Sequence, residues 1–159
     1  MEFSIVELRK EYDSGIEKVI RGCLIEYGAN HEGTAWADPF LGRLSEVYTE
    51  AETVYYVALA GGEVVAGAGI GKVEGSADTC ELQKMYCRKE FRGKGIAQAL
   101  LDQALAFASK HYRYCYLETL DNMIEAQAFY RRNGFRRIDR ALGDTGHVAC
   151  DVRFLKDLR

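Results

Sequence analysis

The chain has 159 residues, a formal net charge of −3, 48% hydrophobic residues and 28% charged residues. This length suits one domain with a substantial core, and the composition is ordinary for a folded globular chain. No apolar run approaches the ~20 residues of a membrane span, and charges interrupt residues 1–10, where a signal peptide would be apolar. We therefore expect a single domain over 1–159, a cytoplasmic location and no membrane partner.

The charge is distributed unevenly along the chain. Residues 1–81 hold 6 Lys and Arg against 15 Asp and Glu, whereas residues 82–159 hold 15 against 9. A basic second half suits an anionic ligand, and an acidic first half suits a cationic acceptor and argues against nucleic acid as a partner. The 5 cysteines are odd in number and form no Cys-x-x-Cys pair. We therefore expect reduced, mostly buried thiols and no metal site.

The first third of the chain predicts one strand and two helices. Residues 2–8 alternate loosely and indicate a strand. Ser14 and Glu17 have the spacing of a capping box, and they precede an apolar stripe of helical period that stops at Gly28. Asp38 and Pro39 then predict the cap and first turn of a second helix with an apolar stripe through 40–48.

A β-hairpin follows these helices. Residues 53–59 and 63–73 are rich in strand formers and flank the turn Gly61-Gly62. Glycines at 67, 69 and 71 leave one face of the second strand thin, which indicates either a bend or the close approach of another segment.

The remaining elements alternate between strands and helices. They are a strand over 79–88, a helix from 96 to about 110, a strand over 112–119, a helix capped by Asp121 or Asn122 that ends at 133–134, and strands over 135–138 and 147–154. Strands outnumber helices, and consecutive strands can pair as a meander. The fold class is therefore α/β of the α+β type, a mixed and mainly antiparallel sheet with helices on both faces.

A glycine turn joins the strand over 79–88 to the helix after it. The segment Arg92-Gly93-Lys94-Gly95-Ile96-Ala97 leaves backbone N–H groups bare at a helix start, where the helix dipole favours an anion. It lacks the third glycine of a dinucleotide fingerprint and the Lys-Ser/Thr ending of a Walker A loop. We interpret it as a cradle for a pyrophosphate.

The pattern Arg-x-x-Gly-x-Ala over 92–97 resembles the coenzyme A signature of the GNAT superfamily of N-acetyltransferases. The resemblance extends over 81–97, similar to the family's fourth strand and the start of its third helix, and over 126–135, similar to its fourth helix and next strand. The first half resembles the family in element order only. The resemblance implies this family's fold and acetyl transfer from acetyl-CoA to an amine.

The resemblance also implies where the donor binds. Backbone groups at the end of the strand before the turn pair with the pantetheine arm as if it were another strand, and Asn122 either bonds that arm or only caps its helix. The implied cofactor-binding residues are Met85, Tyr86, Cys87, Arg92, Gly93, Lys94, Gly95, Ile96, Ala97 and Asn122.

Acetyl transfer requires a base, because neutralising an amine at pH 7 costs roughly 1.4 kcal/mol for an α-amino group and roughly 4.6 kcal/mol for a lysine-like amine. Glu81 is our candidate base, on a strand face that parity shares with Gln83 and Met85. Glu118, or a water chain, is the alternative. Tyr130, placed by the family motif, is the candidate acid for the departing thiolate, although it could instead only pack on the sheet.

The acceptor site is least defined. The loop with His31, Glu32 and Trp36 lies where the family shapes this site, and these side chains could either contact the acceptor or serve structural roles. We expect a small-molecule or peptide amine as acceptor and direct attack in a ternary complex; the resemblance also allows a homodimer through the last strands. The alternatives are a non-catalytic acyl-CoA sensor and an unrelated nucleotide-binding domain.

Overall fold

The computed structural model describes residues 2–142 and 151–159. Within these residues, seven strands and three α-helices follow one another in this order: β1 (Ser4–Glu7), α1 (Asp13–Glu26), β2 (Val54–Ala60), β3 (Glu63–Lys72), β4 (Thr79–Cys87), α2 (Ile96–Ser109), β5 (Tyr114–Thr119), α3 (Ile124–Arg132), β6 (Arg136–Ile138) and β7 (Val152–Asp157). The predicted strand 147–154 begins outside the described residues, and its described part continues to Asp157.

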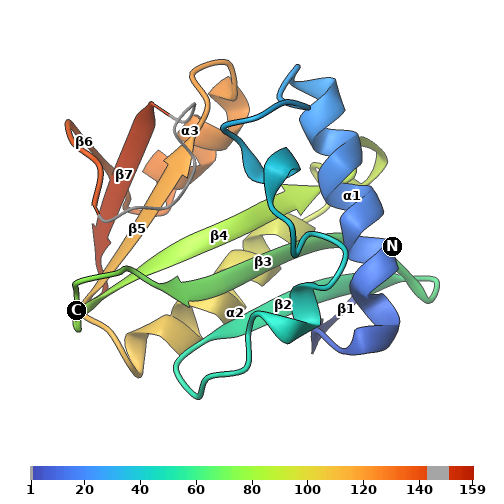
Figure 1. The fold of residues 1–159 in the computed structure, drawn as a ribbon, viewed down its shortest axis with the longest axis horizontal. Helices are drawn as coiled ribbons and strands as arrows, with labels where there is room; N and C mark the ends of the chain where they lie inside the picture. Colours follow the sequence, from blue (N-terminus) through green and yellow to red (C-terminus); the bar gives the residue numbers. More distant parts are fainter. Residues whose placement is uncertain (1, 143–150) are drawn as a thin grey trace.

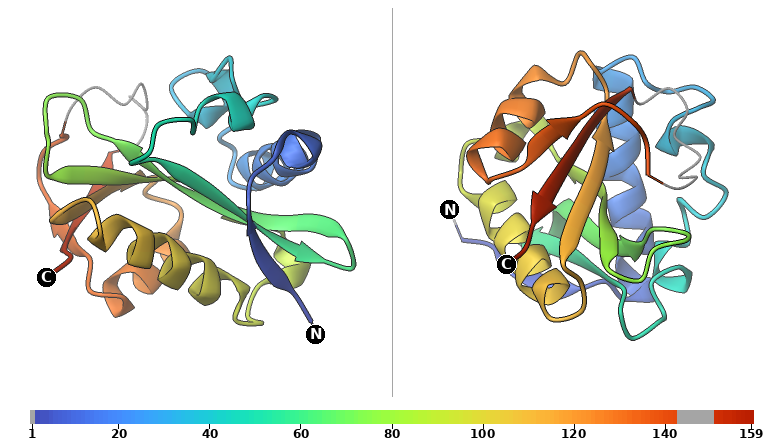
Figure 2. Two further views of the ribbon diagram at one scale, coloured as in Figure 1. Left: turned by 90° about the horizontal axis from the view of Figure 1, so that it is seen from below. Right: turned by 90° about the vertical axis from the view of Figure 1, so that its left-hand side faces the viewer.

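The strands form one seven-stranded sheet in the order β1-β2-β3-β4-β5-β7-β6. Every neighbouring pair is antiparallel except β4 and β5, which run parallel. Helix α1 covers one face of the sheet, and α2 and α3 cover the other (Figures 1 and 2). A separate apolar core fills each of the two layers. This confirms the predicted mixed, mainly antiparallel sheet with helices on both faces.

The predicted second helix over 38–48 is wrong. This segment consists of turns and a single 3₁₀ turn at Leu44–Glu46. The Asp38 carboxylate accepts a hydrogen bond from the backbone N–H of Phe40 at 2.8 Å, which closes a local turn. Only part of the apolar stripe is buried: Leu41 is inside, but Phe40 is 41% exposed. The segment therefore gains too little burial along one side to favour a regular helix.

Two predicted helix caps are also wrong. Helix α1 begins at Asp13, one residue before Ser14, and Glu17 pairs with Arg21 across one helical turn instead of closing a capping box. Helix α3 begins at Ile124 with no side-chain cap. The predicted stop after α1 is confirmed, because Gly28 has φ +68°, a conformation that glycine adopts without strain.

No helix in the described ranges is long and apolar enough to cross a membrane. Four cysteines fall within these ranges, namely Cys23, Cys80, Cys87 and Cys115, and all four are free thiols. Three of them are buried, as expected, whereas Cys150 lies outside the described residues.

Candidate active site

The site lies where the two parallel strands separate. Strands β4 and β5 pair only over Thr79–Glu81 and Tyr114–Tyr116, and beyond Glu81 they diverge (Figure 1). A cavity of about 270 Å³ opens between them, lined by both strands, the C-terminal end of α1, the start of α2 and one side of α3. The diverging strands expose backbone groups that no neighbouring strand satisfies, so the cavity can pair with an extended ligand.

A β-bulge redirects the side chains of β4 within this cavity. Gly67 pairs with Tyr86 and Gly69 pairs with Gln83, so two residues of β4 oppose one residue of β3. Met85, in the bulge, packs against the α2 layer, and Tyr86, directly after it, packs against the α1 layer. The parity that places Met85 on the same face as Glu81 is therefore wrong, because the extra residue reverses the alternation.

Glu81 is the last residue of β4 that pairs with β5, and it is only 4% exposed. Its carboxylate accepts a hydrogen bond from the side-chain Nε2 of Gln83 at 2.8 Å, and the Tyr48 hydroxyl donates to the side-chain Oε1 of Gln83 at 2.8 Å. Burial raises the pKa of Glu81 to about 7, against the lowering effect of the Gln83 hydrogen bond. A carboxyl group with this pKa can take a proton near neutral pH.

The three glycines of β3 make room for this arrangement. A side chain at Gly69 would place Cβ 2.5 Å from the Tyr55 ring and 2.9 Å from the Tyr48 hydroxyl, and one at Gly71 would collide with the Gln83 amide. Close approach of another segment is therefore the correct one of the two predicted explanations. The thin face of β3 admits the side chains that orient Glu81.

Glu118, the alternative base, lines the same cavity from β5. The Tyr116 hydroxyl donates to its carboxylate at 2.7 Å. Its negative charge contributes to raising the pKa of Glu81, so the two carboxylates lie close enough to interact. Burial separates the candidates: Glu81 is almost fully enclosed, whereas Glu118 is only partly so. This difference favours Glu81.

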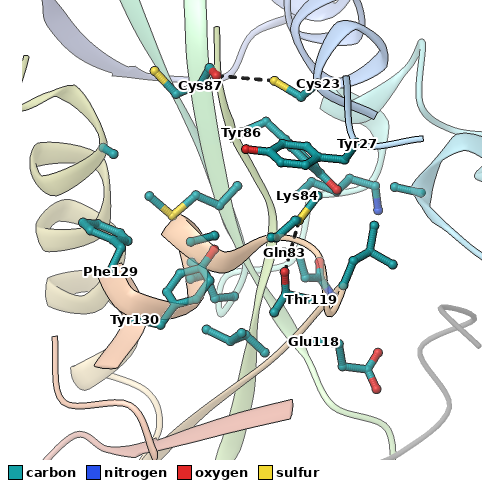
Figure 3. A pocket seen from close by; sticks show the side chains of 18 of the residues that line it. Cys23, Tyr27, Gln83, Lys84, Tyr86, Cys87, Glu118, Thr119, Phe129 and Tyr130 are labelled. Atoms are coloured by element: carbon teal, nitrogen blue, oxygen red, sulfur yellow. Dashed lines mark hydrogen bonds between the residues drawn. The ribbon is translucent and has the colours of Figure 1, made fainter. Parts of the chain in front are cut away.

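Tyr130, the candidate acid, lines the cavity from α3 (Figure 3). It is 7% exposed and lies among the rings of Phe129, Phe135 and Phe154, with centroids 5.7 to 6.3 Å away. Burial raises the pKa of its phenol. Among the described residues its hydroxyl has no hydrogen-bond partner, so the proton is available to a group bound in the cavity.

The glycine turn has the geometry that an anion cradle requires. Gly93 and Gly95 have φ of +73° and +84°, and a Cβ at either position would meet nothing within 4 Å. Gly95 is the N-cap of α2 and provides no side-chain cap, so the first N–H groups of the helix remain open. Lys94 is exposed beside them. The loop therefore fits a pyrophosphate.

The side chain of Arg92 turns away from this loop. Its guanidinium forms a two-point ion pair with Glu26 at 2.7 and 2.8 Å, and its Nε donates to the backbone carbonyl of Cys87 at 2.9 Å. On the β5 side, the Asn122 amide donates to the backbone carbonyl of Tyr27 at 2.9 Å. These contacts attach the end of α1 to both sides of the cavity, and they give Arg92 and Asn122 tethering contacts that the sequence does not predict.

The predicted acceptor loop contributes different residues to the cavity. Thr34 and Ala35 line it, but His31 and Glu32 are exposed, and Trp36 lies under the Arg21 guanidinium at 4.6 Å. An acceptor role for His31, Glu32 and Trp36 stays a prediction. In the described ranges, no cluster of three His, Cys, Asp or Glu side chains could hold a metal ion.

Comparison with known proteins identifies the family to which this chain belongs. Residues 51–137 match the family described as Acetyltransferase (GNAT) domain, and over 146 residues the chain is 46% identical to the uncharacterised N-acetyltransferase YjgM of Escherichia coli (strain K12), covering 90% of this chain and 87% of that protein. The chain belongs to the GNAT acetyltransferase family. It is an acyltransferase of this family, as the glycine turn and the resemblance predict.

Three further similarities are weaker in sequence identity. The N-acetylaspartate synthetase of Rattus norvegicus is 36% identical over 85 residues, 53% of this chain and 28% of that protein. A GNAT acetyltransferase of Staphylococcus aureus Mu50 has a TM-score of 0.84 at 23% identity, covering 99% and 100% of the two chains. PaiA N-acetyltransferase of Thermoplasma acidophilum, solved with coenzyme A, has a TM-score of 0.75 at 19% identity, covering 99% of both. The last two support the fold alone.

Proposed function

We propose that this chain transfers an acetyl group from acetyl-CoA to a primary amine of a small molecule, an amino acid-like compound or a peptide N-terminus, by direct attack in a ternary complex. The observation that carries the proposal is the buried carboxyl group of Glu81, whose pKa is raised to about 7 in the cavity between β4 and β5. Family membership supports the acetyl donor, and the open glycine turn supports a pyrophosphate at the start of α2.

Donor binding and proton transfer are assigned to different parts of the cavity. Gly93, Gly95 and the start of α2 hold the pyrophosphate, and the edge of β4 that no longer pairs with β5 beyond Glu81 holds the pantetheine arm. When bound, acetyl-CoA supplies an acetyl thioester. Glu81 takes one proton from the acceptor ammonium, so that the neutral nitrogen can form the new C–N bond. As the C–S bond breaks, Tyr130 gives its phenol proton to the departing thiolate, and the second proton that the nitrogen loses on becoming an amide restores the phenol.

Glu81 is suited to act as the base because its environment makes the carboxylate more basic and still leaves it ionised near neutral pH. A fully exposed carboxylate, with its ordinary pKa of 4.5, would be a weak base for an amine. Gln83 and Tyr48 hold the carboxylate in one orientation through two successive hydrogen bonds. A pKa near 7 keeps the group largely ionised at slightly alkaline pH while improving the proton transfer.

The experiment measures coenzyme A release from acetyl-CoA across a panel of amines and identifies products by mass. The panel contains polyamines, aminoglycosides, single amino acids (aspartate among them, since a partial relative is named for N-acetylaspartate) and N-terminal peptides. The proposal predicts amine-dependent release that falls at least tenfold in Tyr130→Phe. Tyr112→Phe is the matched control, because this tyrosine is also buried but donates to the Glu52 carbonyl outside the cavity. Tight coenzyme A binding without release for any amine would instead indicate a sensor.

A further inference from the structure

Lys84 occupies an unfavourable position that stability does not explain. Its φ is +48°, the one positive φ among the non-glycine residues that the structure describes, and its side chain is only 10% exposed. A side chain in this conformation is strained, and glycine would avoid this strain. A buried ammonium adds a desolvation cost that its ion pair does little more than offset. Strained positions of this kind collect at functional sites.

The surroundings of Lys84 fix it in the cavity wall. The Tyr55 hydroxyl donates to its backbone carbonyl at 2.6 Å, and its ammonium pairs with the Asp38 carboxylate at 2.8 Å. Lys84 and Gln83 line the cavity (Figure 3). Glu81 also lines it. Its charge reaches Glu81, because it acts to lower the pKa of that carboxyl group. A ligand whose amine lies at Glu81 is therefore within the field of Lys84.

Lys84 is also the cation best placed to bind an acceptor. Of the cavity-lining cations in the described ranges, Arg92 is committed to Glu26, and Arg132 lies on α3, over the Phe129 ring at 5.9 Å. The ammonium of Lys84 has three donors, and the ion pair with Asp38 engages one side of it. The remaining donors can bind a second carboxylate.

We propose that Lys84 binds a carboxylate of the acceptor, so that the acceptor is an amino acid with its amine directed to Glu81 and its carboxylate to Lys84. Asp38 keeps the ammonium in place. This inference rests on the proposed function and narrows its acceptor class. It makes Lys84 a specificity-determining residue whose loss affects acids more than other amines.

The test compares each amino acid with its amide, which keeps the amine and side chain but lacks the carboxylate charge. The amide has the less basic amine and would be the better acceptor if the carboxylate were not recognised. We expect the wild-type enzyme to prefer the acid in kcat/KM. In Lys84→Met we expect KM for the acid to rise about tenfold or more, the effect of losing one charge-assisted hydrogen bond. The ratio of kcat/KM for the acid to kcat/KM for the amide should fall by a similar factor, because any effect on Glu81 is common to both acceptors.

Two further variants separate recognition from a structural role. Asp38→Asn breaks the same ion pair but keeps the ammonium, so it should retain the preference for the acid, whereas a purely structural pair would make it behave like Lys84→Met. Lys110→Met, at an exposed position after α2, is the matched control and should change nothing. A wild-type enzyme that acetylates amides as well as acids would overturn the inference and leave the proposed function standing. Absence of transfer to every amine would overturn both.

Discussion

Replacing Glu81 by Gln should stabilise the fold at alkaline pH while removing the base. Glutamine is nearly isosteric and can still accept the hydrogen bond from Gln83, so the packing is retained. Burial raises the pKa of Glu81 from 4.5 to about 7. At about 1.36 kcal/mol for each pKa unit, ionising this carboxyl group in the folded protein costs on the order of 3 kcal/mol.

The sign of the pH dependence follows from the direction of this shift. Below pH 4.5 the carboxyl group is protonated in both the folded and the unfolded state, so the raised pKa of Glu81 carries no penalty there. As the pH rises through about 7, the wild-type protein progressively loses the stability that the protonated form provides. The Gln variant has no such group, and its advantage in unfolding free energy should grow by about 2 to 3 kcal/mol between pH 5 and 8.

Urea unfolding of both proteins at pH 5, 6, 7 and 8 measures this difference, and the linear dependence on urea gives the unfolding free energies. Over the same range, kcat/KM of the wild-type enzyme should decrease as the pH is lowered below about 7, because Glu81 becomes protonated. The residual activity of the Gln variant should not show this decrease. Glu118→Gln serves as the comparison, because removing this neighbouring charge should lower the pKa of Glu81. A stability difference that stays constant from pH 5 to 8 would refute the reasoning.

Three further substitutions test the site. Gly71→Ala directs a methyl group at the Gln83 amide and should lower kcat about tenfold. The loss of stability should be small, because the flexible Gln83 side chain can move aside while the backbone stays in place. Steady-state kinetics measure the first effect and urea unfolding the second. Gly95→Ala forces a side chain onto φ +84° at the start of α2 and should raise KM for acetyl-CoA, with a stability cost of about 1 kcal/mol. Glu26→Gln frees Arg92 and should raise KM for acetyl-CoA several-fold, because the end of α1 loses its contact with the loop.

Two matched variants control for these effects. Gly22→Ala adds a methyl group within α1, where nothing lies within 4 Å of the new Cβ, so it should be neutral or stabilise by up to about 1 kcal/mol. Glu17→Gln breaks a comparable ion pair with Arg21 within the same helix and should leave KM for acetyl-CoA unchanged. If Gly22→Ala lowered kcat as much as Gly71→Ala, the collision with Gln83 would not be the cause. If Glu17→Gln raised KM as much as Glu26→Gln, the tether to Arg92 would have no special role.

Local chemistry in the sequence predicted most of the fold. Alternating apolar residues, helical stripes and glycine turns each report on a few neighbouring residues, and these signals located the strands, the three α-helices and the glycine turn before α2. The predicted helix over 38–48 failed because Asp38 and Pro39 also suit a turn, and burial by the rest of the fold decides between the two structures. Strand parity failed at Met85 because a bulge inserts a residue without a recognisable sequence signal.

The orienting contacts of the site could not be predicted for the same reason. Gln83 and Tyr48 are 35 residues apart in the sequence, and their hydrogen bond depends on how the loop after α1 folds over the sheet. The thin face of β3 indicated that some segment approaches closely, but spacing alone could not say that Tyr48 and Tyr55 fill it. Similarly, Lys84 acquires its position only from the bulge and from Asp38.

A single-turnover reaction tests the central claim most directly. The protein is mixed with a limiting amount of acetyl-CoA and an excess of the best amine from the panel. Mass spectrometry then follows the amounts of free coenzyme A and acetylated amine, and the mass of the intact protein, over time. Direct transfer predicts that coenzyme A and acetylated amine appear together, one for one, while the mass of the protein stays unchanged. Acetyl-CoA that stays intact in the presence of this amine, or an acetyl group that first appears on the protein, would contradict the account.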